Sequence, residues 1–488
     1  MSQRNGKESR NMMERINTSL IMDFYELTMA NGYFEEGLKD QIAYFDIFYR
    51  SVPDEGGFAI MAGLEQAIRC MQEMKFDDKD IAFLRGKGIF SEGFLEYLRN
   101  FEFQCDVWAI PEGTPIFPGE PVMTVRGPAI QAQLLETILL ICINHESLIA
   151  TKANRIVRAA AGRAVMEFGS RRAHGTSAAV QGARAAYIGG CAGTACASCE
   201  RDFGIPALGT MAHSWVQMFD NEYDAFTKYA QLYPDNCVLL IDTYNVLKSG
   251  LPTAIRVFKE QKPAKMGVRM DSGDLTYLSK QARKVLDEAG LQDCKIVASN
   301  AFDEYLIQDV ISQGACIDSF GVGERLITAR SEAVFGGVYK LAALESPDGT
   351  ISPKIKISEN VSKITNPGFK KVYRYFDRAT GKAMADLIAL YDEEISGSEP
   401  ITLFDPVAPW KKKTLKEYTV KELQVPIFEK GTCVYESPDI KEIQKYCKEQ
   451  VETLYEEVLR FENPHTYYVD LTEKLWNLRK NMIEGSGK

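Results

Sequence analysis

Residues 265–290, "KMGVRMDSGDLTYLSKQARKVLDEAG", decide the fold class of this chain. The apolar run "MGVRM" is typical of a buried strand, and the stretch "LTYLSKQARKVLDEAG" repeats its apolar residues at helical spacing. A short polar loop that begins at Asp271 joins the two. A buried strand followed by a loop and a helix is the repeating unit of a parallel sheet with both faces covered by helices.

The same unit recurs through the middle of the chain. Strand-like runs open the segments "AVMEFGSRRAHG" (164–175), "VLLIDTYN" (238–245), "KIVASNAF" (295–302), "IDSFGVGE" (317–324) and "GGVYKLAAL" (336–344). About six such units, without a glycine-rich nucleotide fingerprint after the first strand, favour a closed α/β barrel over an open sheet. A long amphipathic helix is expected before them, from residue 131 onward.

Length and composition limit the class of protein. A chain of 488 residues is too long for one ordinary core, so two or three domains are expected. A net charge of −10 argues against nucleic acid or an anionic membrane as the partner. The longest apolar run, residues 138–143, is too short to span a membrane. The odd number of cysteines, eleven, and the lack of a signal peptide favour the cytoplasm.

Polar residues and glycines gather where the predicted strands end. In a barrel these carboxyl ends converge on one mouth, which is where active sites lie. Any one of these residues could be a solvated loop end, but five strands that end this way are hard to explain by solubility alone. The residues are Glu167, Arg171, Arg172, Asp242, Arg269, Asp271, Asp274, Ser299, Asn300, Gly321 and Gly323.

These residue types indicate phosphate chemistry. Carboxylates beside phosphates commonly hold Mg²⁺, and an arginine pair can donate to a phosphate or a carboxylate. The glycines of "GVG" (321–323) and "FGG" (335–337) permit the positive φ angles of a phosphate-binding loop. Two such loops in the last units of a barrel match the usual phosphate pocket of that architecture. Together they predict a phosphorylated sugar or nucleotide as substrate.

His213, one of four histidines, lies in the apolar run "GTMAHSWVQMF" (209–219). A single histidine in such a run is more often a packed core residue. Next to phosphate chemistry, however, a neutral imidazole can accept a phosphoryl group. It then needs a partner that orients the ring, and Asp242 is the best candidate in the sequence. Both interpretations stay open at this point.

Seven segments in order between about residues 21 and 341 closely resemble the nicotinate phosphoribosyltransferase family. They are "MDFYELTMANGYF", "EFGSRRAHG", "GTMAHSW", "LLIDTYN", "GVRMDSGDL", "GVGERLITA" and "FGGVYKL", with weaker matches at 359–374 and 463–471. The resemblance implies that nicotinate and phosphoribosyl pyrophosphate give nicotinate mononucleotide and pyrophosphate, the first step of NAD salvage from nicotinate. It also implies ATP as a co-substrate, hydrolysed to ADP and phosphate through a phosphohistidine.

The resemblance also implies an architecture. The expected fold is α/β: the irregular α/β barrel of type II phosphoribosyltransferases, with a mixed α+β domain from both chain ends and a helical C-terminal extension. We expect the mixed domain over residues 1–128, completed by about 360–400, the barrel over 129–355 and the extension over 400–488. A cytoplasmic homodimer with shared active sites is expected.

Roles carry over residue by residue from the matching motifs. His213 corresponds to the phosphohistidine, and Asp242 and Asp271 to catalytic carboxylates near the ribose and Mg²⁺. Nicotinate is expected at Tyr25, Thr210 and Arg269. The phosphates of phosphoribosyl pyrophosphate are expected at Arg171, Ser299, Gly321, Gly323, Gly336 and Gly337.

The chain departs from the family pattern at three places. Met22 replaces a hydroxyl residue, and Glu324 replaces the usual threonine after the second glycine, where a carboxylate must turn outward or help to bind Mg²⁺. Ala195 lies where nicotinamide-using relatives tend to carry aspartate, which would repel a substrate carboxylate. Since alanine supplies no positive donor, the preference for the acid must come from elsewhere, for example Arg269.

Three alternatives stay open. A nicotinamide phosphoribosyltransferase would share the fold and the chemistry, and a non-catalytic phosphoribosyl pyrophosphate sensor would share the scaffold. A barrel lyase or aldolase would need a lysine at a strand end, and Lys340 is the only obvious one. The cysteines Cys191, Cys196 and Cys199 contain one C-x-x-C spacing without a second pair, which only weakly indicates zinc.

Overall fold

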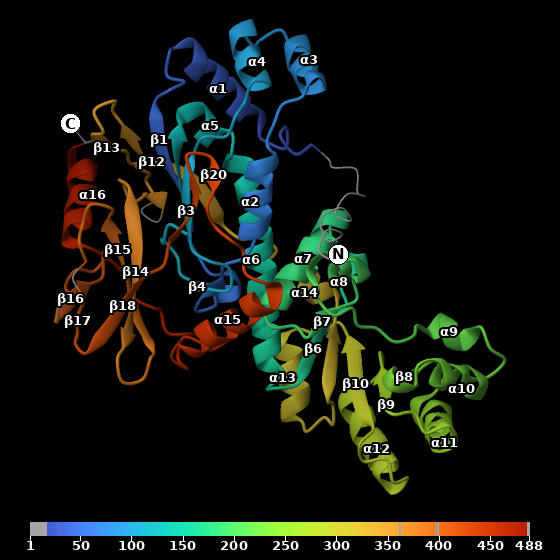
Figure 1. The fold of residues 1–488 in the computed structure, drawn as a ribbon. Coiled ribbons are helices and arrows are strands. Elements are labelled where there is room, and N and C mark those ends of the chain that lie inside the picture. Colours follow the sequence, from blue (N-terminus) through green and yellow to red (C-terminus); the bar gives the residue numbers. More distant parts are fainter. Residues whose placement is uncertain (1–16, 361–362, 396, 398–399, 486–488) are drawn as a thin grey trace, which may run out of the picture. The chain divides into compact units, whose positions relative to one another are not determined.

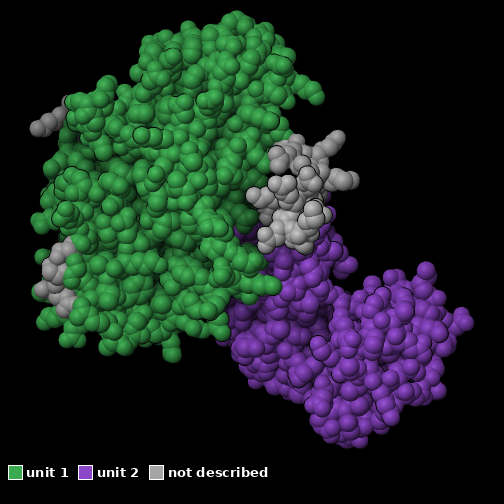
Figure 2. Space-filling view, in the orientation of Figure 1, with its two compact units in different colours: residues 1–148, 334–488 green, residues 149–333 purple. Residues whose placement is uncertain are grey.

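The computed structural model describes residues 17–360, 363–395, 397 and 400–485, which belong to two compact units (Figures 1 and 2). Unit 1 combines residues 1–148 and 334–488, and unit 2 comprises residues 149–333. The first sixteen residues of the predicted N-terminal domain lie outside the described residues, as do residues 361–362 of one weaker matching motif.

Unit 2 contains the predicted parallel sheet. Its six strands run in the order β7 (Gly193–Thr194), β6 (Ala164–Glu167), β11 (Ser319–Val322), β10 (Lys295–Asn300), β9 (Met266–Met270) and β8 (Cys237–Leu240). Every neighbouring pair is parallel. The helices after the strands are α7 (Thr176–Ile188), α11 (Leu251–Gln261), α12 (Leu275–Glu288) and α13 (Glu304–Ser312). The predicted alternation of strand and helix is confirmed.

The sheet is an irregular half-barrel, which confirms the fold class but not the closure of the barrel. β7 and β8 are its edge strands and do not pair with each other. The chain between them forms helices instead of further strands, namely α8 (Ala197–Phe203), α9 (His213–Gln217) and α10 (Glu222–Leu232) (Figure 1).

The opening stretch of sequence shows how each unit is built. β9 buries Gly267, Val268 and Met270, and α12 buries residues three or four positions apart, which is the spacing of one helix face. Asp274 caps α12, because its side chain accepts a hydrogen bond from the backbone N–H of Tyr277 at 2.9 Å. Asp274 is therefore a structural cap, although the sequence grouped it with the candidate site residues.

Unit 1 has a seven-stranded sheet at its centre. The strand order is β13 (Ile351–Pro353), β12 (Gly337–Glu345), β1 (Ile42–Tyr49), β5 (Met123–Pro128), β3 (Asp106–Ala109), β19 (Val425–Glu429) and β20 (Thr432–Cys433). The helices α2 (Leu64–Glu73), α3 (Asp78–Gly86) and α4 (Glu92–Arg99) lie between β1 and β3 in the chain.

The prediction that residues 336–344 form the last barrel unit is wrong. β12 pairs antiparallel with β1, from Ile42 opposite Glu345 to Tyr49 opposite Gly337. The aromatic side chains explain the pairing: Tyr339 stacks on Phe45 with ring centroids 4.8 Å apart. Unit 2 accordingly ends at residue 333, before the predicted barrel boundary at 355.

The C-terminal part of unit 1 contains a second sheet. β14 (Lys370–Asp377) and β15 (Ala383–Leu390) form a four-stranded sheet with β18 (Tyr418–Glu422) and β21 (Val469–Leu471), separate from the seven-stranded sheet. Residues 400–488 are no separate helical extension, because β19 pairs with β3 and buries Ile427 and Phe428. The helices α15 (Ile440–Glu452) and α16 (Glu473–Gly485) alternate with these strands.

The long helix expected from residue 131 is present as α5 (Ala129–Gln133) and α6 (Glu136–Ala159). Among the described residues, the stretch 129–159 is the one helical segment long and apolar enough to cross a membrane by length and composition. However, 67% of its most apolar window is buried inside the structure, as in a core helix of a globular protein. Its composition is therefore explained by packing.

The helix α1 (Phe24–Glu35) is fixed by a buried carboxylate. Glu26 accepts a hydrogen bond from the backbone N–H of Asp23 at 3.1 Å and others from Thr137. Its second carboxylate oxygen is buried and has no hydrogen-bond partner among the described residues. Burial raises the pKa of Glu26 to about 7, although the hydrogen bonds lower it.

Glu26 should make stability depend on pH. Its pKa is raised in the folded state, from 4.5 to about 7, so the folded chain holds the proton more tightly than the unfolded chain. The contribution of Glu26 to the free energy of unfolding therefore falls as pH rises between these values, by at most about 3 kcal/mol. Glu26→Gln keeps the accepting oxygen without the charge, and its melting temperature should rise relative to the parent between pH 5 and pH 8. If the difference in melting temperature between Glu26→Gln and the parent is the same at pH 5 and pH 8, the raised pKa of Glu26 is contradicted. Glu35→Gln, on the exposed end of α1, is the control.

Candidate active site

The register of the parallel sheet brings the predicted strand-end residues to one edge. Glu167 lies opposite Val322 and Thr194, Ser299 lies opposite Gly321, and Leu240 lies opposite Arg269. The residues at or just after these positions therefore form a row along the carboxyl edge of the sheet. In sheet order the row consists of Thr194, Glu167, Gly321, Ser299, Asp271 and Asp242.

Asp242 joins two neighbouring strand ends. Its Oδ2 accepts hydrogen bonds from the backbone N–H of Asp271 at 2.8 Å and from the hydroxyl of Ser272 at 2.7 Å. Its Oδ1 is buried and accepts no hydrogen bond from the described residues. A buried carboxylate oxygen without a donor is costly, which marks this atom as a place for a ligand.

His213 faces this open oxygen. Its Nε2 lies 3.9 Å from Asp242 Oδ1, and its side chain is 40% exposed, so His213 is no packed core residue. The expectation that Asp242 orients the ring is wrong, because 3.9 Å exceeds hydrogen-bond distance. The orienting partner is Thr243, whose hydroxyl lies 3.1 Å from Nδ1. Thr243 is not among the residues predicted from the sequence, because a single hydroxyl after a strand has no distinguishing pattern.

The segment before His213 is tied to β9 by Arg269. The guanidinium of Arg269 donates from Nη2 to the carbonyl oxygen of Met211 at 2.6 Å. Its Nε and the hydroxyl of Thr210 are both buried without a hydrogen-bond partner among the described residues. Burial lowers the pKa of Arg269, while the nearby Asp271 and Asp242 raise it. Two of the three predicted nicotinate residues, Thr210 and Arg269, thus present unpaired polar groups.

A buried glutamate, Glu167, holds the loop that carries Arg171. The sequence placed Glu167 at a strand end but predicted no specific role for it. Glu167 is fully buried and accepts hydrogen bonds from the hydroxyl of Thr194 at 2.5 Å and from the backbone N–H of Gly169. Burial raises the pKa of Glu167. Arg171 follows in a short helix, Ser170–Arg172, and is exposed. Its guanidinium forms no ion pair with a carboxylate of the described residues, so it can meet an anion.

The hydroxyl of Ser299, predicted to bind phosphate, donates its hydrogen bond to a neighbouring residue instead. Its hydroxyl donates to Asp271 Oδ1 at 2.5 Å. The backbone N–H of Asp271 in turn donates to Asp242. Ser299 therefore holds the Asp271 carboxylate in place at the edge of the sheet.

The prediction that the four glycines adopt positive φ angles is wrong, because none of them does. Close packing explains why three of these positions have no side chain. A Cβ at Gly321 would lie 2.6 Å from the ring of Phe168, one at Gly323 2.9 Å from the carbonyl oxygen of Phe168, and one at Gly337 2.1 Å from the side chain of Asn144. A Cβ at Gly336 would meet nothing within 4 Å.

Three predicted site residues belong to unit 1, whereas the other predicted site residues belong to unit 2. The three in unit 1 are Tyr25, Gly336 and Gly337. Tyr25 is 43% exposed on α1, and burial and a hydrogen bond to Glu136 raise the pKa of its hydroxyl. Glu136 also pairs with Lys340 at 3.4 Å. This ion pair leaves Lys340 poorly suited to the Schiff-base chemistry of an aldolase.

Glu324 does turn away from the glycine segment. Its carboxylate pairs with Arg330 at 3.0 Å, and both side chains are substantially exposed. The described residues contain no cluster of three or more histidine, cysteine, aspartate or glutamate side chains that could hold a metal. A zinc site at Cys196 and Cys199 therefore lacks further ligands, whereas Mg²⁺ needs few protein ligands when substrate phosphates and water supply the others.

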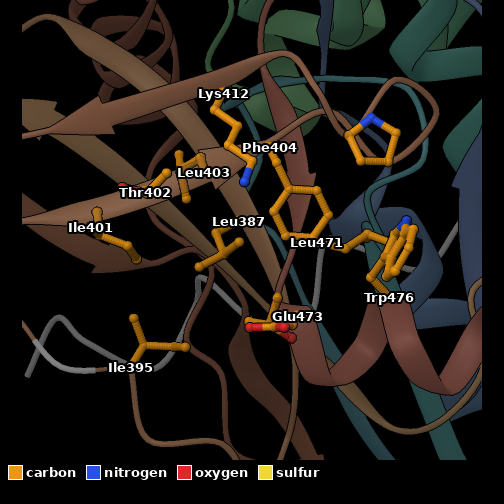
Figure 3. A pocket seen from close by; sticks show the side chains of 12 residues that line it. Leu387, Ile395, Ile401, Thr402, Leu403, Phe404, Lys412, Leu471, Glu473 and Trp476 are labelled. Atoms are coloured by element: carbon orange, nitrogen blue, oxygen red, sulfur yellow. The ribbon is translucent and has the colours of Figure 1, made fainter.

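Unit 1 also contains an apolar pocket of about 470 Å³ (Figure 3). Leu387, Phe404 and Trp476 contribute to its walls, and Lys412 and Glu473 are the charged residues in its lining. None of the predicted site residues lines this pocket. The carboxyl edge of the parallel sheet is therefore the better candidate for chemistry.

Gly321→Ala tests whether packing explains this glycine. The new methyl group must displace the ring of Phe168, which belongs to the segment between Glu167 and Arg171. Overpacking of this kind costs about 1–3 kcal/mol. We expect a lower melting temperature by differential scanning fluorimetry, and no change for Gly336→Ala, whose methyl group has free space. Equal melting temperatures of Gly321→Ala and the parent would contradict the packing account.

Family models cover almost the whole chain. Residues 20–144 match the nicotinate phosphoribosyltransferase N-terminal domain, residues 163–367 the nicotinate phosphoribosyltransferase family and residues 369–479 the nicotinate phosphoribosyltransferase C-terminal domain. The chain is 44% identical to the nicotinate phosphoribosyltransferase of Bacillus subtilis over 95% of each chain.

Solved structures show the same architecture. The crystal structure of human nicotinic acid phosphoribosyltransferase matches with a TM-score of 0.83 at 27% identity, over 95% of this chain and 100% of the human one. Nicotinate-nucleotide pyrophosphorylase from Pyrococcus furiosus matches with a TM-score of 0.68 at 22% identity, over 90% and 99% of the two chains. At that identity the second match shows the fold alone.

Proposed function

The chain belongs to the nicotinate phosphoribosyltransferase family, a family of NAD-biosynthetic enzymes, and on that premise we propose that it makes nicotinate mononucleotide. Nicotinate displaces pyrophosphate from phosphoribosyl pyrophosphate in this reaction. We further propose that ATP hydrolysis is coupled to turnover through phosphorylation of His213. The observation that carries this proposal is the buried, unpaired Oδ1 of Asp242, which faces Nε2 of His213 at 3.9 Å.

The surroundings of His213 suit a phosphoryl acceptor. If Nδ1 donates its proton to the hydroxyl of Thr243, Nε2 keeps a free lone pair, and this side of the ring faces the site. Nε2 attacks the γ-phosphorus of ATP, the bond to the bridging oxygen breaks and ADP leaves. The ring gains positive charge as the new bond forms, and the Asp242 carboxylate stabilises that charge. Water later cleaves the phosphohistidine and releases phosphate.

The unpaired groups at Arg269 and Thr210 support nicotinate as the substrate. Arg269 Nε and the Thr210 hydroxyl can both donate to a carboxylate, which would satisfy two buried polar groups at once. An amide in the same place would offer one acceptor and bring its own donors, which leaves part of this potential unused. Ala195 adds no repelling charge. We therefore propose that Arg269 provides most of the preference for the acid.

The diphosphate is proposed to bind along the edge that Asp242 and Asp271 form. The open Oδ1 of Asp242 and the carboxylate of Asp271 are oxygen donors of the kind that Mg²⁺ takes, with water and phosphate oxygens as its other ligands. Mg²⁺ held by these two carboxylates would neutralise charge on the diphosphate. Arg171 supplies a further positive charge, and the backbone at Gly321 and Gly323, at the same edge, is proposed to approach the phosphates.

We propose that the protein works as a cytoplasmic homodimer in which Tyr25 of one protomer packs on the nicotinate of its partner. Tyr25 and Phe24 of α1 are 43% and 46% exposed. Large aromatic side chains left exposed on one helix are consistent with a surface that another chain or ligand covers.

Pyrophosphate release with nicotinate and phosphoribosyl pyrophosphate, with and without ATP, tests the proposal. The parent should turn over nicotinate, and ATP should accelerate it. His213→Ala should lose the acceleration but keep slow turnover, because the carboxyl-edge donors remain. His465→Ala removes a histidine of unit 1 and should behave like the parent.

The other outcomes separate the alternatives. Turnover that ignores ATP in both the parent and His213→Ala would keep the transferase and remove the phosphohistidine. Turnover of nicotinamide without nicotinate would assign the chain to the amide-using enzymes. Binding of phosphoribosyl pyrophosphate without any turnover would identify a sensor.

A further inference from the structure

The C-x-x-C pair has no part in the proposed reaction, yet its geometry is that of a thiol couple. Cys196 is the N-cap of α8, and Cys199 lies in the first turn, where its backbone N–H donates to the carbonyl oxygen of Cys196 at 3.0 Å. Residues three apart in a helical turn have Cα atoms about 5 Å apart. That separation is inside the range of about 4.4–6.8 Å that a disulfide spans.

The two thiols differ in access. Cys196 is half-buried, whereas Cys199 is fully buried, and its thiol donates to the carbonyl oxygen of Val180 at 3.7 Å. Burial, and then the neighbouring Cys196, raise the pKa of the Cys199 thiol. A solute can thus reach Cys196, while Cys199 waits beside it as the second thiol. This division of roles is what a dithiol needs in order to close in two steps.

Among the cysteines of the described residues, no other combines these two features. The thiol of Cys196 itself contacts the hydroxyl of Ser198 at 3.3 Å. Cys316 and Cys433 are half-buried, but neither has a second cysteine within three residues, and their thiols donate to backbone carbonyl oxygens. Cys70 and Cys142 contact each other, but both are buried.

We propose that Cys196 and Cys199 form a reversible dithiol–disulfide couple that regulates the carboxyl edge of the parallel sheet. Cys196, as thiolate, attacks one sulfur of a small-molecule disulfide, and the first thiol leaves and takes up a proton. Cys199 loses its proton to water and attacks Cys196 Sγ, which forms the protein disulfide and releases the second thiol. Two protein thiols are oxidised while one small-molecule disulfide is reduced to two thiols.

The couple is connected to the site by hydrogen bonds. The backbone N–H of Cys196 donates to the hydroxyl of Thr194 at 3.0 Å, and that hydroxyl donates to Glu167 at 2.5 Å. Glu167 also accepts from Gly169, at the start of the segment that carries Arg171. Closing the disulfide pulls Cys199 Sγ away from Val180 and turns the Cys196 side chain inward. Because the backbone of Cys196 is bonded to Thr194, this movement strains the hydrogen bonds that run from Cys196 through Thr194 to Glu167. Its effect on turnover rests on the proposed function.

The test equilibrates the full chain with graded ratios of reduced and oxidised glutathione, followed by alkylation and peptide mass spectrometry. Cys196 and Cys199 should lose their alkylation together and appear as one disulfide-linked pair that dithiothreitol reverses. Cys70 and Cys142 contact each other but are buried, so they are the internal control. They should remain unoxidised thiols and therefore be alkylated once the protein is denatured. Both cysteines of the couple lie in one peptide, so the disulfide appears as the loss of two hydrogens from that peptide, and detecting it needs no variant and no activity.

Activity and backbone exchange are measured on the same samples. Pyrophosphate release should fall about tenfold as the disulfide forms, because a displaced substrate-binding loop has effects of this order or larger. Hydrogen exchange at residues 168–172 should change at the same ratios. Cys196→Ser should keep its turnover in oxidised glutathione, Cys199→Ser should carry one glutathione on Cys196, and Cys316→Ser should respond like the parent.

The outcomes against the couple are distinct from those against the reaction. A reduced protein without turnover contradicts the proposed function alone, and the mass mapping and hydrogen exchange still decide the couple. The couple is overturned if no disulfide links Cys196 to Cys199. It is also overturned if that disulfide forms while hydrogen exchange at 168–172 stays unchanged, or if turnover of an active protein stays unchanged.

Discussion

The carboxylate of Asp242 is the interaction on which the candidate site depends. One of its oxygens accepts from the backbone N–H of Asp271 and from Ser272, which fixes the end of β8 against the end of β9. The same two bonds leave the second oxygen buried and directed at His213. The two oxygens of Asp242 therefore differ: one holds two strand ends together, and the other faces His213 without a hydrogen bond.

The other candidate site residues along the carboxyl edge of the sheet are also held in place by hydrogen bonds to supporting residues. Ser299 holds Asp271, Thr243 holds the His213 ring, and buried Glu167 holds the loop that leads to Arg171. Such preorganised donors and charges stabilise developing charge without having to reorganise during the reaction. The dithiol at Cys196 and Cys199 adjoins this support rather than the reacting atoms, which is why it can regulate the site without taking part in the chemistry.

Sequence patterns predicted which residues meet at the site, because they indicated the topology of the sheet. They did not predict features that depend on contacts between distant side chains. The strand–loop–helix repeat indicated parallel strands, and parallel strands bring Asp242, Asp271 and Ser299 to one edge whatever their separation in sequence. The repeat could not tell that β12 is antiparallel, because that pairing depends on the stacking of Tyr339 on Phe45 from a distant part of the chain. A glycine in a sequence likewise does not reveal whether it serves a positive φ angle or, as at Gly321, a close aromatic ring.

The most direct test of this account is the transfer of label from [γ-³²P]ATP to the protein, compared between the parent and Asp242→Asn. Asparagine can still accept the bonds from Asp271 and Ser272, so the substitution removes the charge that faces His213 while it keeps the support. The account predicts acid-labile label on His213 in the parent and a large loss of label in Asp242→Asn. Asp274→Asn, a change at the cap of α12, should leave the label unchanged. Equal labelling of the parent and Asp242→Asn would contradict the role given to Asp242.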